Sequence, residues 1–508
     1  MTEREPPAAA RYELLLGSLI AAFVLTAWWS FGTMNSLWSR PSNFWTTTYY
    51  VKTSIEVVAS AYAVFYLLVA WYYRMPVHSR GGARWPRQQP SIYGAYLCCD
   101  DLDVQALESM VAFCGRDTLR LLVHDDSSTP SARAQVDEVV QRFRQAYRRD
   151  IQVLRRVDRS GGKPGALNNI IEQLPAEVEY LLLCDSDSFL LDENLLAKAL
   201  PYFDEPDVAL IQFRTIGHQL PGDGPGYRIL ASSVAFYDAF VSFMDRFGWS
   251  PFLGHNALLR VSAVTAVGGF TPGQLADDID FSVKLRLHGY HLRYARNIVC
   301  GERHPLSYGA LRRRTRKWAY GCTQILLRWG WPVLTSPRFS LAEKGTFFLT
   351  VSYYHFQLLL LLYLAIFYLL LPFDDRAMGG MSHVMVSAWL ILLLTFFPSI
   401  SYFAQAGRLR HWPKTVIYWG FTYGSQDFVM LEAVWRCLWR KQLAWVPTNT
   451  GLAVRGTVHF FPELCFGSLV VVVALLQHPA LLLLPTTILF VGKFLVAPFL
   501  ERGVFRAR

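Results

Sequence analysis

Apolar residues gather towards both ends of the chain, and a segment of mixed composition lies between them. Two charge-poor runs come first, at residues 12–29 and 51–73. Four more follow, at residues 345–372, 381–403, 457–476 and 480–500. A helix that crosses the hydrocarbon core of a bilayer needs about 20 such residues. The pattern therefore predicts two membrane spans, then a globular domain, then four more spans.

The same pattern divides the chain into four parts. Residues 1–74 contain the two N-terminal spans, and residues 75–308 form a globular domain. Residues 309–343 combine basic and aromatic residues at amphipathic spacing, which is typical of helices at a membrane interface. Residues 344–508 contain the other four spans, with a polar region at 405–456 that we expect on the same side as the globular domain.

The distribution of Lys and Arg predicts how the chain is oriented in the membrane. The loops at 31–47 and 373–382 each contain a single basic residue, whereas the region 405–456 contains many. Because cytoplasmic loops carry the excess of Lys and Arg, both ends of the chain and the globular domain are predicted to be cytosolic. The leader before the first span is mixed in charge and no small-residue cleavage site follows, which indicates an uncleaved span. We therefore expect a multi-pass protein of a bacterial-type inner or plasma membrane.

Composition supports this assignment and argues against another class of partner. Of the 508 residues, 52% are apolar and only 17% are charged, which is unusual for a soluble protein. The net charge of +10 lies largely beside the spans, where it favours contact with anionic lipid over nucleic acid. The eight cysteines have no metal-ligand or disulfide spacing, so we expect buried thiols in a reducing compartment.

Within the globular domain, short apolar strands alternate with segments of helical periodicity. Strands are predicted at residues 91–99, 119–125, 151–156 and 178–185, and helices at 104–114, 134–147 and 162–174. This alternation is typical of an α/β fold with a mostly parallel sheet. In such sheets, ligands bind outside the carboxyl ends of the strands.

Acidic residues stand at the carboxyl ends of two of these strands. Asp125 and Asp126 follow the second strand, and Asp185 and Asp187 follow the fourth. A lone D-x-D of this kind also occurs in ordinary turns. Two carboxylates on a short turn can nevertheless hold a divalent cation through one or two oxygens and leave its other positions to a diphosphate. The two acidic pairs therefore predict a metal and nucleotide site at this edge of the sheet.

Three further segments carry polar residues that suit a ligand. Lys163 lies in a glycine-rich helix start, which is a favourable place for phosphate. Asp277 and Asp278 begin an amphipathic helix, where acidic residues can take part in catalysis or simply cap the helix. The segment Arg312–Trp331 is basic, aromatic and amphipathic, so it can contact a ligand or lie flat as a plain interfacial helix.

Taken in order, these motifs and the flanking spans resemble the membrane-embedded processive glycosyltransferases of family 2, the group of cellulose, chitin and hyaluronan synthases. The resemblance covers nearly the whole chain. It implies that the globular part is a GT-A catalytic domain inserted in an α-helical membrane domain of six helices. It also implies that Asp125 and Asp126 hold the uracil and ribose of a UDP-sugar, with Lys163 near the nucleotide. Asp185 and Asp187 would bind Mg²⁺ or Mn²⁺ together with the diphosphate.

The resemblance also assigns residues to the acceptor side. The family's T-E-D is represented by Ala276-Asp277-Asp278, which places Asp278 on the catalytic base. The family's Q-x-x-R-W is represented by the five residues from Arg314 to Trp318, so Arg replaces Gln and Lys317 replaces Arg. These matches imply that Lys317 contacts the donor, and that Trp318 offers an aromatic face to the acceptor with Asp277 nearby.

Other segments match relatives of this family. Gly254–Arg260, "GHNALLR", resembles the osmoregulated periplasmic glucan synthases, which places His255 and Asn256 on the acceptor side and favours UDP-glucose over UDP-N-acetylglucosamine. Gly321 and Gln324, which follow the tryptophan, also match. Lys441–Gly451 resembles the cytoplasmic gating loop of these enzymes.

The sequence thus predicts a processive inverting glycosyltransferase that polymerises a β-linked polysaccharide from a UDP-sugar and moves it across the membrane. Its predicted partners are the UDP-sugar donor, the growing polysaccharide and the lipid bilayer, with no nucleic acid. Two alternatives stay open: a non-processive enzyme that makes a glycolipid, and a non-enzymatic transporter or scaffold. Because the sequence ends eight residues after the last predicted span, no C-terminal cyclic-dinucleotide module is expected.

Overall fold

The computed structural model of the chain describes most of the globular domain and part of the helical region. Apart from a few isolated positions, the described residues are 43–73, 90–116, 119–218, 237–303, 308–370, 421–443, 460–477 and 485–503. The predicted spans at 12–29 and 381–403 fall almost entirely outside these ranges, as does most of the predicted gating loop.

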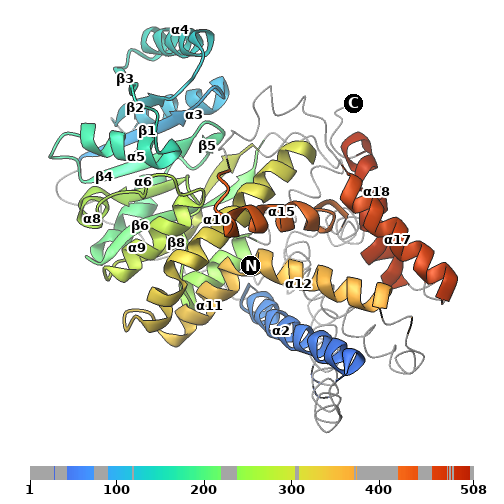
Figure 1. Ribbon diagram of the computed structural model, residues 1–508. Helices are drawn as coiled ribbons and strands as arrows, with labels where there is room; N and C mark the ends of the chain where they lie inside the picture. Colours follow the sequence, from blue (N-terminus) through green and yellow to red (C-terminus); the bar gives the residue numbers. More distant parts are fainter. Residues whose placement is uncertain are drawn as a thin grey trace, which may run out of the picture.

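The globular domain is built on one eight-stranded sheet with the strand order β3-β2-β1-β4-β7-β6-β8-β5 (Figure 1). The first four strands are those that the sequence predicts: β1 Ile92–Cys98, β2 Arg120–Asp125, β3 Ile151–Leu154 and β4 Tyr180–Asp185. They pair in parallel. The other four strands are β5 Ser188–Leu190, β6 Val208–Gly217, β7 Ala257–Arg260 and β8 His291–Glu302.

The second half of the sheet corrects the expectation of a mostly parallel arrangement. β7 pairs antiparallel with both β4 and β6, and β5 pairs antiparallel with β8, so that only β6 and β8 are parallel there. A parallel pair requires a helical crossover, and the strand–helix alternation supplies one only for the first four strands. The sheet is therefore mixed, with the parallel half on the side of the predicted nucleotide site.

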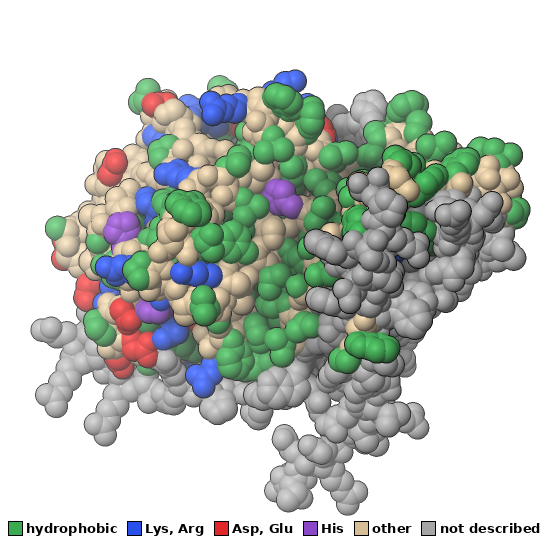
Figure 2. Space-filling view, turned by 60° about the horizontal axis from the view of Figure 1, so that its bottom comes forward, with side chains coloured by type: hydrophobic (Ala, Val, Ile, Leu, Met, Phe, Trp, Pro, Cys, Tyr) green, Lys and Arg blue, Asp and Glu red, His purple; other side chains and the backbone are tan. Residues whose placement is uncertain are grey.

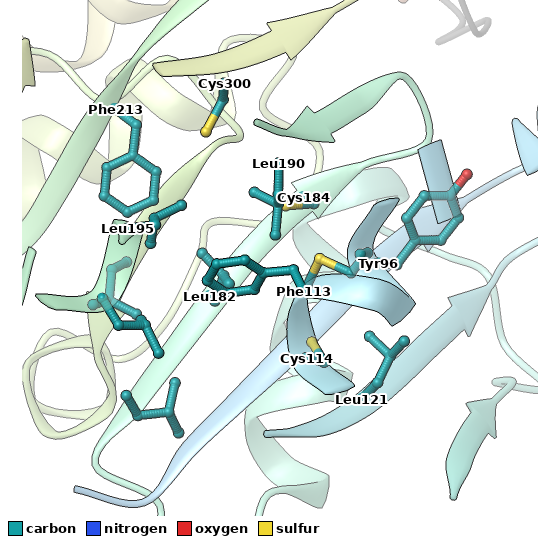
Figure 3. Close-up of a cluster of buried hydrophobic side chains, with 14 of the residues drawn as sticks. Tyr96, Phe113, Cys114, Leu121, Leu182, Cys184, Leu190, Leu195, Phe213 and Cys300 are labelled. Carbon is teal, nitrogen blue, oxygen red and sulfur yellow. The ribbon is translucent and has the colours of Figure 1, made fainter. Parts of the chain in front are cut away.

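Helices cover both faces of the sheet because successive strand residues point to opposite sides. Tyr96 and Cys98 of β1 belong to one core, which is closed by α3 Val104–Arg116 and α4 Pro130–Tyr147. Figure 3 shows part of this core, where Phe113 of α3 lies among side chains of the sheet. The residues between them face the second core, which is closed by α5 Gly162–Gln173, α8 Val261–Ala266 and α9 Asp277–Leu287. Strands buried on both faces read as continuous apolar runs, which is why the sequence pattern located them.

The remaining helices lie on the other side of the molecule (Figure 1). They are α2 Phe44–Tyr73, α10 Tyr308–Thr335, α11 Leu341–Val351, α12 Tyr353–Ala365 with a π-helical extension to Leu370, α15 Asp427–Leu438, α17 Phe461–Gln477 and α18 Pro485–Gly503. A third core joins them to the domain: Phe65 of α2 packs with Phe243 of the helical segment 237–247, next to Ile325 of α10. Arg286 of α9 and Glu343 of α11 form an ion pair of 2.6 Å across the same junction.

The helical region is the apolar part of the surface. Figure 2 shows charged side chains over the α/β domain and mainly hydrophobic side chains over the helices beside it. Leu469, Val472 and Leu476 of α17 are about half exposed or more. Within the described residues, the helical stretch Tyr353–Leu370 is long and apolar enough to cross a bilayer, and α17 is a shorter apolar helix. The predicted span at 345–372 contains this stretch, although its first residues belong to α11; the arrangement of six spans stays a prediction.

Candidate active site

The D-x-D motif forms the tight turn between β4 and β5, and neighbouring strands hold its backbone in place. The Asp185 N–H donates to Ser188 Oγ at 3.1 Å, and the Tyr96 hydroxyl donates to the Ser186 carbonyl at 3.0 Å. The Ser186 hydroxyl donates to Asp101 Oδ2 at 2.8 Å. On the other side, the Arg303 N–H donates to the Asp187 carbonyl at 3.0 Å. A turn held on both sides presents its two carboxylates in a fixed orientation.

These carboxylates lie in an environment that disfavours their negative charge. Burial raises the pKa of Asp187 well above its usual range, and Glu302 and Asp185 raise it further. Asp185 Oδ1 is buried and has no hydrogen-bond partner within the described ranges. Oxygen donors of this kind suit a hard divalent cation.

The protein alone supplies only part of a coordination shell for such a cation. Among the residues that the structure describes, there is no group of three or more His, Cys, Asp or Glu side chains placed to hold a metal ion. Mg²⁺ is commonly bound through one or two carboxylates, with substrate phosphates and water completing its shell. Asp185 and Asp187 fit that mode of binding.

Lys163 links the D-x-D to the rest of the site from the first turn of α5. Its Nζ lies 2.6 Å from Asp185 Oδ2 and donates to the Gly254 carbonyl at 3.0 Å. Burial lowers the pKa of Lys163, but the carboxylates of Asp185 and Asp277 more than offset this effect and leave the pKa above its usual range. Gly161 caps the helix at φ +77°, a conformation that favours glycine. A charged amine is thus fixed beside the carboxylates, where a diphosphate would lie.

Asp277 and Asp278 stand at the first turn of α9, as the sequence predicts. Asp278 Oδ1 accepts a hydrogen bond from the Ile279 N–H at 2.8 Å. A Cβ atom added to Gly254, whose φ is +91°, would lie 3.3 Å from Asp278 Oδ2. Asp278 therefore faces the same backbone segment that accepts a hydrogen bond from Lys163. The D-x-D, the lysine and Asp278 form one continuous site.

The environment gives Asp278 the properties of a base that works near neutral pH. Burial raises the pKa of Asp278 to about 6; the negative charge of Asp277 also raises it, and Lys317 and Lys163 oppose the rise. Burial likewise raises the pKa of Asp277. Asp280, one turn further on, is instead bound by the Trp329 Nε1–H at 2.7 Å and has a structural environment.

Helix α10 packs directly on the turn before Asp277. A Cβ atom added to Gly321 would lie 2.7 Å from the Cβ of Ala276, which is closer than side chains approach, so this contact requires glycine. The Leu275 N–H donates to Gln324 Oε1 at 3.2 Å. These two contacts give a structural reason for the glycine and glutamine that the sequence singles out: they fix α10, and with it Trp318, against the base.

Trp318 lies on α10 between two other side chains. The Arg314 guanidinium carbon lies 4.7 Å from the centroid of its ring, and Tyr237 approaches it edge-on at 6.4 Å. The sequence leads us to expect an open aromatic face, whereas one face of the indole is covered by Arg314. Lys317, its neighbour, lies within electrostatic reach of Asp277 and Asp278.

Asp125 and Asp126 lie at the same sheet edge, but arginines engage both carboxylates. Asp125 Oδ2 lies 2.7 Å from Arg155 Nε, and Asp126 accepts two hydrogen bonds from Arg156 at 2.6 and 2.9 Å. Arg156 also donates to the Gly162 carbonyl at 2.8 Å. The two pairs tie the loop before α5 to the end of β2. Their contact with uracil and ribose stays a prediction.

His255 and Asn256 occupy different surroundings. His255 Nδ1 lies 3.2 Å from Ser188 Oγ, and its Nε2 lies 3.8 Å from Glu302 Oε2, so it stands on the D-x-D side. Asn256 is buried at φ +51°, and its Nδ2–H donates to Thr215 Oγ1 at 3.3 Å. An acceptor role for either residue stays a prediction.

Sequence reasoning missed two carboxylates of the site, Asp101 and Glu302. Burial raises the pKa of Asp101 to about 6, hydrogen bonds from the Cys99 N–H and the Ser186 hydroxyl oppose the rise, and Asp185 adds to it. Asp101 could have been found, because acidic residues follow β1 and β1 is the parallel neighbour of β4. Glu302 reaches the site through the antiparallel pairing of β5 and β8, which no local pattern announces.

The geometry is that of an enzyme site for an anionic donor, with a base on the opposite side, and comparisons with known proteins specify its class. Residues 180–405 match the family described as "Glycosyl transferase family group 2". The chain therefore carries a family 2 glycosyltransferase domain, and its mixed sheet is a GT-A-like fold.

Several known proteins are similar to this chain. "Probable glucomannan 4-beta-mannosyltransferase 1" of Arabidopsis thaliana is 26% identical over 53% of this chain and 48% of its own length. "Beta-monoglucosyldiacylglycerol synthase" of Synechocystis sp. is 26% identical over 44% of this chain and 45% of its own length. A UDP-forming cellulose synthase of Dictyostelium discoideum, matched through its catalytic polypeptide, is 28% identical over 33% of this chain and 16% of its own length. Each similarity thus spans less than half of the relative.

A solved structure is also similar: a mannosyltransferase, PcManGT, from Pyrobaculum calidifontis in complex with GDP-Man and Mn2+. The similarity has a TM-score of 0.47 at 16% identity and covers 77% of this chain and 100% of that one.

Proposed function

We propose that this protein is a processive inverting glycosyltransferase that builds a β-linked polysaccharide from a UDP-sugar, with UDP-glucose favoured, and passes the product through its membrane helices. The observation that carries the proposal is the position of Asp278. It is a buried carboxyl that faces Gly254, and the Gly254 carbonyl accepts a hydrogen bond from Lys163, which contacts the D-x-D. A base on one side and a diphosphate site on the other are what inversion at a sugar carbon requires.

In the proposed reaction, Asp278 accepts the proton of an acceptor hydroxyl while that oxygen forms a bond to the anomeric carbon of the donor sugar. The bond from this carbon to the diphosphate breaks, and UDP leaves. Lys163 holds the diphosphate end of the donor through its fixed positive charge. Mg²⁺ or Mn²⁺ at Asp185 and Asp187 would neutralise the charge that develops on the leaving group. Trp318 positions the acceptor near Asp278.

The membrane helices support the translocation part of the proposal. The stretch Tyr353–Leu370 can cross a bilayer, and α17 presents exposed Leu and Val side chains next to it. Both connect through shared cores to α10, which carries Trp318. A growing chain held at Trp318 would therefore stand where the catalytic domain meets these helices.

A direct test is to incubate the purified protein, in detergent or vesicles, with a panel of nucleotide sugars that includes UDP-glucose, UDP-N-acetylglucosamine and GDP-mannose. UDP-glucose is expected to yield a polymer that a β-specific hydrolase degrades. Vesicles loaded with that hydrolase in their lumen report translocation separately from synthesis. A polymer formed only from another donor would refute the choice of UDP-glucose, and no sugar transfer from any donor would refute the enzyme.

A second candidate is a glycolipid synthase that transfers a single sugar to a lipid. The similarity to "Beta-monoglucosyldiacylglycerol synthase" favours it, since that match extends over 44% of this chain. The two candidates differ in where the labelled sugar goes. A lipid product partitions into organic solvent and needs added diacylglycerol, whereas a polysaccharide stays in the aqueous or insoluble fraction.

Trp318→Ala is expected to reduce polymer synthesis sharply while slow hydrolysis of the UDP-sugar by water persists. The substitution removes the acceptor platform and leaves Asp278 and the D-x-D intact, so positioning is lost and chemistry is kept. The measurement compares polymer length with UDP release. If Trp318 is only an interfacial anchor, Trp318→Phe and Trp318→Ala will both make polymer of normal length, and this outcome would exclude the platform.

Transfer is also expected to depend on pH through Asp278. Because the folded pKa of Asp278 is raised to about 6, the carboxyl is protonated below that pH and cannot accept the acceptor's proton. The kcat/KM value should rise about tenfold per pH unit below pH 6 and level off above pH 7. Asp277→Asn removes a neighbouring negative charge and should shift this limb to lower pH. A kcat/KM that stays constant down to pH 5 would rule out this assignment.

A further inference from the structure

Arg314 differs in its contacts from the other basic residues of α10. Arg312 pairs with Glu463 at 2.6 Å, and Arg316 pairs with Glu432 at 2.9 Å. Arg314 forms no ion pair with any residue in the described part of the chain. Its guanidinium instead lies over the ring of Trp318, one helical turn along, at 4.7 Å. An arginine that is not used for an ion pair, on the residue expected to hold the acceptor, requires another explanation.

The contact with Trp318 is itself energetically favourable. A guanidinium over an indole gains cation–π and stacking attraction, and residues four apart on a helix face each other. Tyr237 meets the same indole edge-on, with the ring planes at 73°. The indole is therefore held from two sides and cannot rotate freely.

Part of the guanidinium is nevertheless left without a partner. The Nε atom of Arg314 is buried and finds no hydrogen-bond acceptor among the described residues. Burial lowers the pKa of Arg314, but Tyr423 and Glu302 more than offset this effect, so the pKa lies above its usual value and the group stays charged. A buried donor without an acceptor is costly, and an oxygen atom of a ligand would remove that cost.

The groups that face Arg314 indicate what kind of ligand this is. Besides Glu302 they include the phenol groups of Tyr237, Tyr354 and Tyr423. The carboxylate of Glu302 already offsets the positive charge, so a second anion is not needed for balance. Tyrosine hydroxyls and a guanidinium together can donate to and accept from the hydroxyls of a sugar.

We propose that Arg314 binds and positions the acceptor: it fixes the Trp318 indole through its plane and donates hydrogen bonds to hydroxyl oxygens of an uncharged sugar. The inference rests on the proposed function, since it concerns the acceptor of that same reaction. In this reading the acceptor meets an indole edge and a guanidinium, where the family's motif has a glutamine.

The test compares Arg314→Gln, Arg314→Lys and the control Arg316→Gln, with a short β-linked oligosaccharide of the product as acceptor. Arg314→Gln is expected to raise the acceptor KM about tenfold or more, because hydrogen bonds from a charged donor are lost. Arg314→Lys keeps the charge but loses the planar group, so it should recover only part of the loss. Arg316→Gln removes a half-exposed ion pair and should leave the KM within about twofold.

Hydrolysis of the donor by water separates this role from a structural one. It should stay within about twofold of the wild type in all three variants, since the donor site is unchanged. An acceptor KM within about twofold of the wild type in Arg314→Gln, with transfer intact, would overturn the inference alone. So would an acceptor bearing a carboxylate or phosphate that binds the wild type tenfold more tightly than the neutral sugar. A wild-type protein that neither hydrolyses nor transfers any nucleotide sugar would overturn the proposed function itself.

Discussion

Replacing Asp278 by Asn is expected to lower sugar transfer by about 10²–10⁴-fold while UDP-sugar binding stays close to that of the wild type. The amide keeps the shape of the carboxyl and can still accept the hydrogen bond from the Ile279 N–H, which measures 2.8 Å in the native site. It cannot accept the acceptor's proton. The loss should therefore appear in kcat, measured as UDP release and as polymer formed, with UDP affinity measured by calorimetry.

Asp280→Asn is the matched control for this substitution. Asp280 lies on the same helix and is fully buried, but its carboxylate accepts a hydrogen bond from Trp329, far from the D-x-D in its contacts. The asparagine can still accept that bond, so turnover should change by no more than a few fold. If Asp278→Asn retains more than about a tenth of wild-type turnover, another group is the base.

Asp278 and the D-x-D could be located from sequence because each sits at the end of an element with a strong local pattern. β4 is a continuous apolar run, and its end is marked by the change to Asp185. α9 starts where three acidic residues precede an amphipathic stretch. Local hydrophobic period and helix-start chemistry are both written in neighbouring residues, so they are readable without the fold.

Contacts between distant segments could not be read in this way. Glu302 comes beside Asp187 only because β8 pairs with β5 in a particular register, Ser188 opposite Glu302. The pairing of Asp125 with Arg155 joins the ends of two parallel strands. The stacking of Arg314 on Trp318 needed only helical spacing, but which face the acceptor would use depends on Tyr237, which lies more than 70 residues earlier in the chain. Each of these facts is set by tertiary packing.

The sheet repeats the same lesson at a larger scale. Where strands and helices alternate, the right-handed crossover rule leaves little choice, and the parallel half follows. β7 has only four residues and is followed at once by α8, so its direction depends on the long connection before it. Short strands of this kind carry too little local pattern to fix an antiparallel partner.

Asp187→Ala is expected to lower transfer by about 100-fold or more and to remove the effect of Mg²⁺ or Mn²⁺ on UDP affinity. Asp187 lies at the end of the β4–β5 turn, where burial and Glu302 already raise its pKa, so its carboxylate is most stable next to a cation. Even loss of a group that only supports a metal ligand commonly costs 10–100-fold, and Asp187 is proposed as a ligand itself. The measurement is UDP binding by calorimetry, with and without added metal, for the wild type and the variant.

Asp192→Asn provides the control, because Asp192 follows β5 by two residues and its carboxylate is already paired with Lys198. Its substitution should leave both turnover and metal dependence unchanged. The argument then depends on a difference between two acidic residues five positions apart. If wild-type protein keeps full activity in excess EDTA, or if metal still raises the UDP affinity of Asp187→Ala as it does that of the wild type, the D-x-D does not act through a cation. Lys163, at 2.6 Å from Asp185, would then have to neutralise the leaving diphosphate by itself.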